Sequence, residues 1–221
     1  MIAKVAVFSK KTGLILSTLG WLILLSLPGA QTAAQSRAGQ AGARPQPDEK
    51  SQAAESAALK YFTDVQLVNH NGESMKFYSD LLKEKVVIIN AFFTSCTGVC
   101  PAMNQTLEKV QEWLGPRLNK DAYIVSISVD PLTDTPAKLK EYAPRFHAKP
   151  GWFFITGRKE NVELALHKLG QKVEVREDHS TIIIIGNERT GLWKKALGLA
   201  QPDALIKVIA SVLDDKPVAL K

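Results

Sequence analysis

Two cysteines spaced four residues apart are the side chains of this sequence best suited to chemistry. The 221-residue chain contains only these two, Cys96 and Cys100, between the end of an apolar run and the start of a helical pattern. A thiol just before a helix lies near unpaired backbone N–H groups and the positive end of the helix dipole, which both favour the thiolate. Thiolates bind soft metal ions and attack disulfides, so we expect both sulfurs to be reactive.

A structural disulfide between the two cysteines is the alternative interpretation, and an oxidising compartment would favour it. If both cysteines were helical, their Cβ atoms would lie roughly 5–6 Å apart. A disulfide prefers roughly 3.5–4.5 Å between these atoms. The bond therefore requires Cys96 to lie in the loop, and closing so short a loop adds little entropic stabilisation. We favour a functional site over a purely structural one.

One histidine is placed to complete a metal site with these thiols. Two thiolates a helical turn apart suit monovalent copper, and one imidazole would give a three-coordinate site. His179 directly precedes the β-branched run 181–185, and a strand start can lie beside the strand-to-helix turn that carries the cysteines. The other three histidines are expected at the surface or at a helix end: His70, His147 and His167.

Several other polar and sulfur-containing side chains near these motifs have structural explanations. Asp178 is not expected to orient His179, because adjacent residues on a strand point to opposite faces. Asp130 and Asp134 are expected to organise their loop and to cap the helix that follows. Met103 lies on the apolar stripe of its helix and is expected to pack in the core.

The pattern of apolar residues around the motifs alternates between strands and helices. Strands are predicted over residues 61–68, 86–93, 123–129, 152–155, 181–185 and 192–197, and helices over 101–114, 135–146, 161–169 and 203–213. The unbroken apolar run 86–93 indicates a strand buried on both faces. The alternation predicts an α/β fold with a mixed central sheet and helices on both faces.

The first 34 residues have the features of an export signal. Lys4, Lys10 and Lys11 precede the apolar run 14–27, which is followed by small residues. The run is shorter than the roughly 20 apolar residues that span a bilayer, which favours a cleaved signal peptide over an N-terminal membrane anchor. With either outcome the folded part is expected outside the cytoplasm, in the periplasm, and an uncleaved segment would tie it to the inner membrane.

Residues 35–58 are predicted to be a flexible linker, and residues 59–221 the folded domain. The linker is rich in Ala, Gln, Gly and Pro. It has no periodic apolar face whose burial could offset the conformational entropy lost on ordering. The net charge is +6, but removing residues 1–34 leaves 25 basic and 22 acidic residues, or +3. Because this charge is weak and no basic residues alternate with aromatic ones, nucleic-acid binding is excluded.

Four segments of the chain, in order, resemble the signatures of the Sco/SenC proteins. They are FFTSCTGVCP at 92–101, SISVDP at 126–131 followed by DTP at 134–136, WFFITG at 152–157 and DHS at 178–180. The resemblance spans about Tyr61 to the C-terminus. It implies a thioredoxin-like fold, an exported location, and copper bound by Cys96, Cys100 and His179. Family members assist copper-site assembly in cytochrome c oxidase, by delivering copper, by reducing the target's cysteines, or both.

The chain departs from the family pattern around the cysteines. Residues 97–99 are Thr-Gly-Val where many relatives have Pro-Asp-Val. The three residues before Cys96 are Phe93-Thr94-Ser95 in place of an aromatic residue followed by Thr-His. Losing the acid removes a charge that would raise the thiol pKa values or tune the choice of partner. Neither change replaces a ligand, so copper binding is still expected.

The leading hypothesis is therefore a copper metallochaperone whose partner is the copper-bearing subunit of cytochrome c oxidase or another exported copper or thiol protein. The alternative is an enzyme, a thiol-disulfide oxidoreductase in which Cys96 and Cys100 form a redox-active pair and His179 is not needed. A thiol peroxidase of related fold ranks last. Peroxiredoxins usually place a threonine three residues before the reactive cysteine, and that position is Phe93 here.

Overall fold

A mixed sheet of seven strands organises the computed structural model, which describes residues 49–216. Its strand order is β2-β1-β5-β4-β3-β6-β7, with parallel pairs β3–β4 and β4–β5 at the centre and antiparallel hairpins at both edges. The strands are β1 (Gln66–Asn69), β2 (Ser74–Lys76), β3 (Val86–Phe92), β4 (Ala122–Ser128), β5 (Trp152–Thr156), β6 (Ile182–Asn187) and β7 (Leu192–Leu197).

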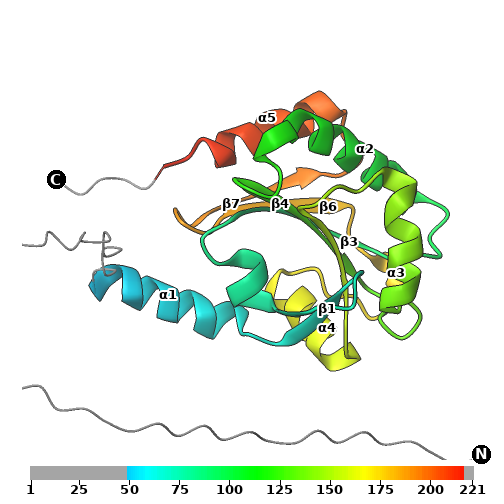
Figure 1. The fold of residues 1–221 in the computed structure, drawn as a ribbon, viewed down its shortest axis with the longest axis horizontal. Coiled ribbons are helices and arrows are strands. Elements are labelled where there is room, and N and C mark those ends of the chain that lie inside the picture. The colour runs from blue at the N-terminus through cyan, green and yellow to red at the C-terminus, as the bar shows by residue number, and fades with distance from the viewer. Residues whose placement is uncertain (1–48, 217–221) are drawn as a thin grey trace, which may run out of the picture. The chain divides into compact units, whose positions relative to one another are not determined.

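Helices cover both faces of this sheet, as the sequence predicts (Figure 1). One face packs against α2 (Val99–Leu114), α3 (Pro136–Tyr142) with the 3₁₀ turn Ala143–Phe146, and α5 (Pro202–Leu213). The other face packs against α1 (Glu49–Phe62), the π-helix Phe77–Leu82 and α4 (Lys159–Lys168). The sheet thus separates two hydrophobic clusters, and the cysteines belong to the side covered by α2 and α5.

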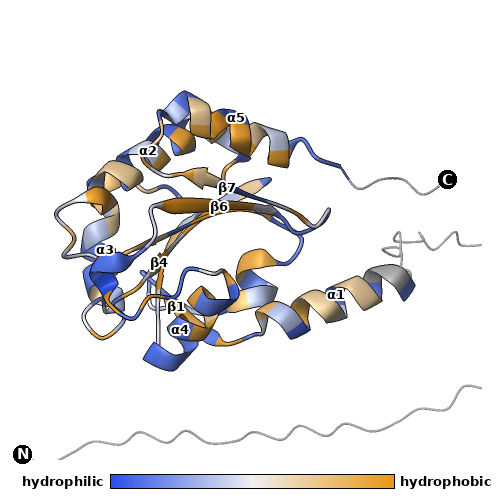
Figure 2. Cartoon of the chain, turned by 180° about the vertical axis from the view of Figure 1, so that it is seen from behind, coloured by the Kyte–Doolittle hydropathy of each residue, from blue (hydrophilic) through white to orange (hydrophobic). Residues whose placement is uncertain are grey.

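The central strand β3 is buried along its whole length, because every one of its seven residues lies between the two helical layers. The neighbouring strand β6 has the same strongly hydrophobic character in Figure 2. In the parallel pair, Val86 lies opposite Ala122 and Phe92 lies opposite Ser128. The carboxyl ends of β3 and β4 are therefore level with each other, and the loops that leave them are neighbours.

Strand β6 runs antiparallel to β3, with Ile184 opposite Ile89 and Asn187 opposite Val86. The start of β6 consequently lies at the end of the sheet where β3 finishes. This pairing brings the segment before β6, which contains His179, to the same edge as the cysteine loop after β3.

Two glycines and one capping threonine shape the turns and helix ends of the chain. Gly72, in the turn between β1 and β2, has a φ of +83°, which glycine adopts without strain. Gly115 ends α2 with a φ of +52°. Thr135 caps α3, with its hydroxyl accepting the Lys138 N–H at 3.4 Å and with Pro136 as the first helical residue.

The structure differs from the sequence prediction before β1. Helix α1 occupies residues 49–62, where the linker and the start of the first strand were expected. Ala58 and Phe62 lie on one face of this helix and pack against the second hydrophobic cluster, which provides the burial that the composition alone did not reveal. Strand β2 and the π-helix Phe77–Leu82 were not predicted either.

The predicted signal or anchor segment, residues 1–34, lies outside the described residues, as does the linker before Glu49. Within residues 49–216, no helix combines the length and the apolar character needed to cross a bilayer.

Candidate metal centre

Cys96 lies in the loop between β3 and α2. Its backbone N–H donates to the Phe93 carbonyl at 3.2 Å, which turns the chain sharply after the strand. Its side chain is partly exposed and packs at the margin of the α2 and α5 cluster. Cys96 is therefore the member of the pair that solvent or a partner can reach.

Cys100 lies one helical turn further on, as the second residue of α2. Helix α2 begins at Val99, two residues earlier than predicted, so Cys100 is inside the helix rather than in front of it. Its side chain has no solvent exposure and forms part of the main hydrophobic cluster. The two thiols thus lie in contrasting environments although they are four residues apart.

His179 faces Cys100 from the loop that precedes β6. Its Nε2 lies 3.1 Å from the Cys100 Sγ, and its side chain is buried. Its Nδ1 lies 3.3 Å from the Ser180 carbonyl, which can only accept a hydrogen bond. A ring proton on Nδ1 would satisfy this carbonyl and leave the Nε2 lone pair facing the thiol. Burial lowers the pKa of His179, which keeps the ring in the neutral form that binds metals.

The two sulfurs and the imidazole nitrogen form a compact set of potential metal ligands. The ligand atoms of Cys96, Cys100 and His179 all lie within 4.8 Å of one another. Among residues 49–216, no other group of three or more His, Cys, Asp or Glu side chains has this arrangement. Soft thiolates with one imidazole suit Cu(I), so the donor set fits the metal that the sequence predicts. The structure brings together the three predicted residues, and their role as ligands stays a prediction.

The expectation that both sulfurs favour the thiolate is wrong for Cys100. Burial and the neighbouring Cys96 side chain raise the pKa of Cys100 to about 12. The thiol packs among apolar side chains, so the cost of desolvating a thiolate outweighs the stabilisation from the helix N-terminus. The raised pKa favours the protonated thiol in the metal-free protein, so a metal ion bound there would have to displace that proton.

The main geometric objection to a disulfide does not apply, because Cys96 lies in the loop. Both cysteines are free thiols in the structure. A loop residue can move its sulfur toward the first turn of α2 without unwinding the helix. The site is therefore compatible with a reversible disulfide as well as with a bound metal.

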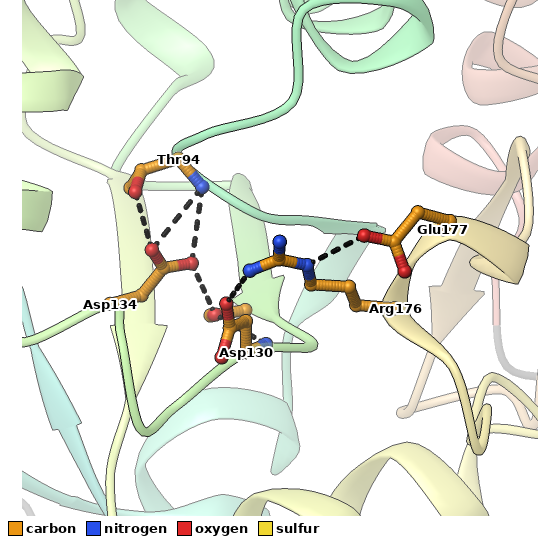
Figure 3. Close-up of polar contacts among 6 residues, drawn as sticks. Thr94, Asp130, Asp134, Arg176 and Glu177 are labelled. Atoms are coloured by element: carbon orange, nitrogen blue, oxygen red, sulfur yellow. Dashed lines mark hydrogen bonds and ion pairs between the residues drawn. The ribbon is translucent and has the colours of Figure 1, made fainter.

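A buried carboxylate anchors the loop that carries Cys96 (Figure 3). Asp134, which has no solvent exposure, accepts the Thr94 backbone N–H at 3.1 Å and the Thr94 hydroxyl. It also accepts the Ser128 hydroxyl at 2.6 Å. Asp134 was expected to cap the following helix, but Thr135 does so, and Asp134 instead ties the cysteine loop to the end of β4.

An ion pair connects the His179 segment to the same region (Figure 3). Arg176 donates to Asp130 at 2.5 Å and to Glu177 at 2.8 Å. Its guanidinium also lies 5.2 Å from the centre of the Phe93 ring. The sequence predicts Asp130 to organise its loop but gives no signal for Arg176, because the ion-pair partner of Arg176 is 46 residues away.

The remaining residues singled out from the sequence lie away from the ligand set. Met103 is fully buried in the core, as predicted. His147 is exposed and pairs with Glu108, and His167 lies on the exposed face of α4. His70 is partly buried and its Nδ1 accepts the Phe154 N–H at 3.3 Å, so it contacts strand β5 and lies outside the ligand set.

Residues 53–214 match the family model described as SCO1/SenC. A SCO2-like protein of Rickettsia conorii is 36% identical over 105 residues, which cover 48% of this chain and 49% of that protein. The match therefore spans about half the length of this curated relative.

Solved structures with the same fold cover more of the chain. The structure of yeast Sco1 with copper bound is 25% identical, with a TM-score of 0.57 over 69% of this chain and 92% of that one. BsSco is 26% identical, with a TM-score of 0.57 over 68% of this chain and 92% of that one. It is described as a Sco-family cytochrome c oxidase assembly protein in which a disulfide switch was identified. These likenesses confirm the predicted thioredoxin-like fold.

Proposed function

This chain belongs to the SCO1/SenC family, and we propose that it binds one copper ion through Cys96, Cys100 and His179 and passes the ion to a partner protein. The observation that carries the proposal is the convergence of two sulfurs and one imidazole nitrogen within 4.8 Å of one another. Copper bound to a relative of the same fold, yeast Sco1, supports the choice of metal.

The unequal exposure of the ligands suits a site that must both hold and release its metal. Cys100 and His179 are buried, so they would hold a bound ion away from solvent. Cys96 is partly exposed, so the thiol of a partner can approach the ion on that side and replace Cys96 as a ligand. Transfer by ligand exchange needs such an accessible thiol.

We propose the copper-bearing subunit of cytochrome c oxidase as the recipient, with another exported copper or thiol protein as the alternative. The description of BsSco as an oxidase assembly protein supports this class of target. The proposed location is the periplasm, with residues 1–34 acting as the export signal or as a tether to the inner membrane. The basic opening and apolar run of that segment support this location.

Thiol-disulfide exchange is the second candidate, and the loop position of Cys96 favours it. In that reaction the Cys96 thiolate attacks a partner disulfide and one partner sulfur leaves as a thiolate. Cys100 then attacks the mixed disulfide and releases the second partner sulfur. The two thiols of this chain are oxidised to a disulfide, the partner's disulfide is reduced to two thiols, and two protons pass to the partner. His179 takes no part in these steps.

The test is copper stoichiometry by elemental analysis of the reduced full-length protein and of Cys96→Ala and His179→Ala. His167→Ala is the matched control, because it removes an exposed imidazole outside the ligand set. One copper per chain that is retained in the control and lost in both ligand variants is the expected result. A wild-type protein that binds no copper but exchanges disulfides, with His179→Ala equally active, would establish the second candidate.

A further inference from the structure

The ligands of the proposed copper site come from two segments that are distant in the sequence. Cys100 and His179 are 79 residues apart, and the loop of His179 carries no regular structure beyond the 3₁₀ turn Arg176–Asp178. A three-coordinate site forms readily only if this loop is held at the cysteine loop before the metal arrives. Some contact outside the ligand set must supply that restraint.

Arg176 makes the contacts that can hold the two segments together. It belongs to the His179 loop and donates to Asp130, which belongs to the loop after β4. It also lies over the Phe93 ring, at the start of the cysteine loop. One side chain therefore joins three loops that end at the same edge of the sheet.

The Phe93 ring transmits this contact directly to a ligand. It is 6% exposed and packs edge-on against the His179 imidazole, with 5.5 Å between ring centres and an interplanar angle of 86°. The guanidinium, the phenyl ring and the imidazole therefore pack in series. Displacing Arg176 removes a packing contact from the Phe93 ring. The Phe93 ring in turn packs against the His179 imidazole and helps to orient it.

The ion pair is also connected to the anchor of the cysteine loop. The Asp130 backbone N–H donates to the Ser128 hydroxyl at 3.0 Å, and that hydroxyl donates to Asp134. Asp134 in turn accepts two hydrogen bonds from Thr94. A continuous path of polar contacts thus runs from the His179 loop to the loop of Cys96.

We propose that Arg176 is a positioning residue that pre-organises the copper ligands by fixing the His179 loop against Phe93 and Asp130. The inference rests on the proposed copper-binding function but concerns a residue that touches no metal. Outer contacts of this kind typically change metal affinity 10- to 100-fold.

The direction in which Arg176 substitutions change copper affinity distinguishes a positioning role from a purely electrostatic one. Arg176 carries a positive charge, and removing it also leaves the carboxylates of Asp130 and Glu177 without this partner. If only the local field mattered, Arg176→Gln would bind a copper cation more tightly. Positioning predicts the opposite, and Arg176→Lys, which keeps the charge but loses the planar two-sided contact, should also bind more weakly.

The experiment measures Cu(I) dissociation constants of the full-length reduced protein by competition with a chromophoric chelator, together with amide hydrogen exchange of the metal-free protein. Arg117→Gln is the matched control, because Arg117 also stacks on an aromatic ring, that of Trp113 at 4.4 Å, but follows the far end of α2. Thermal unfolding of each variant checks that the fold is retained.

Arg176→Gln is expected to weaken copper binding about 10-fold or more, and Arg176→Lys to weaken it as well, while Arg117→Gln is unchanged. Exchange should accelerate in both variants over residues 93–98 and 176–181. Equal or tighter copper binding by Arg176→Gln would overturn the inference while leaving the proposed function intact. A wild-type protein without copper affinity would overturn the proposed function, and unchanged exchange in the variants would then refute the positioning role independently.

Discussion

The cysteine loop and the histidine loop reach the same site but are held there by different means. Residues 93–98 follow a fully buried strand and are anchored by Asp134, a carboxylate with no solvent exposure. Residues 176–180 are held through Arg176, whose side chain is 41% exposed. Buried hydrogen bonds are costly to break, whereas exposed ion pairs contribute little. The site therefore combines a rigid half that carries the thiols with a more adjustable half that carries the imidazole.

Removing the buried anchor should have the largest effect on stability. Asp134→Ala leaves the Thr94 N–H and the Thr94 and Ser128 hydroxyls without their acceptor. We expect the free energy of unfolding to fall by about 2–4 kcal/mol, because each buried donor left unsatisfied costs about 1–3 kcal/mol. Urea denaturation of the metal-free protein measures this loss. Asp203→Ala, an exposed acid on α5, is the control, and an Asp134→Ala variant as stable as the control would refute the rigid anchor.

Within the rigid half, the two thiols should differ in what they contribute to the metal-free fold. Cys100→Ser places a more polar hydroxyl in the main hydrophobic cluster, where the His179 Nε2 is its neighbouring polar group, and should cost about 1–3 kcal/mol. Cys96→Ser changes a partly exposed loop residue, so its effect should stay within about 0.5 kcal/mol. Denaturation in the presence of a reductant and a chelator measures both. Equal losses in the two variants would show that the environments of the thiols are more alike than the structure indicates.

The adjustable half should give a much smaller change in stability than the buried anchor. Asp130→Asn weakens the ion pair to Arg176, and the partial exposure of that pair limits its contribution to about 0–1 kcal/mol. The difference between wild type and variant should shrink further at high salt, because mobile ions screen the pair. Unfolding measured at low and high ionic strength tests this. If Asp130→Asn lowered the free energy of unfolding as much as Asp134→Ala does, the histidine loop would be held as firmly as the cysteine loop, and the proposed difference between them would be wrong.

The central elements and the thiols were predictable because their signals are local. The apolar run of β3 and the apolar stripe of α2 are contiguous in the sequence, and the cysteines lie at their junction. His179 was also predicted, because its place before a β-branched strand limits where the fold can bring it. Its contact with Cys100 depends on the antiparallel pairing of β6 with β3, which the sequence suggests but does not specify.

The features that the sequence did not predict depend on contacts between distant residues. Helix α1 has a composition typical of a linker, and it is stabilised where Ala58 and Phe62 pack on the second cluster. The raised pKa of Cys100 follows from burial that the position of α2 determines. Arg176 gave no signal because an arginine in a charged loop is ordinarily solvated, and only the folded chain brings it to Asp130 and Phe93.

The most direct test of the account is X-ray absorption spectroscopy of the Cu(I)-loaded full-length protein, compared with His179→Ala loaded under the same conditions. We expect two sulfur scatterers and one nitrogen scatterer in the wild type, and loss of the imidazole contribution in the variant. A first shell of sulfur alone, or a nitrogen signal that persists in His179→Ala, would contradict the three-residue site.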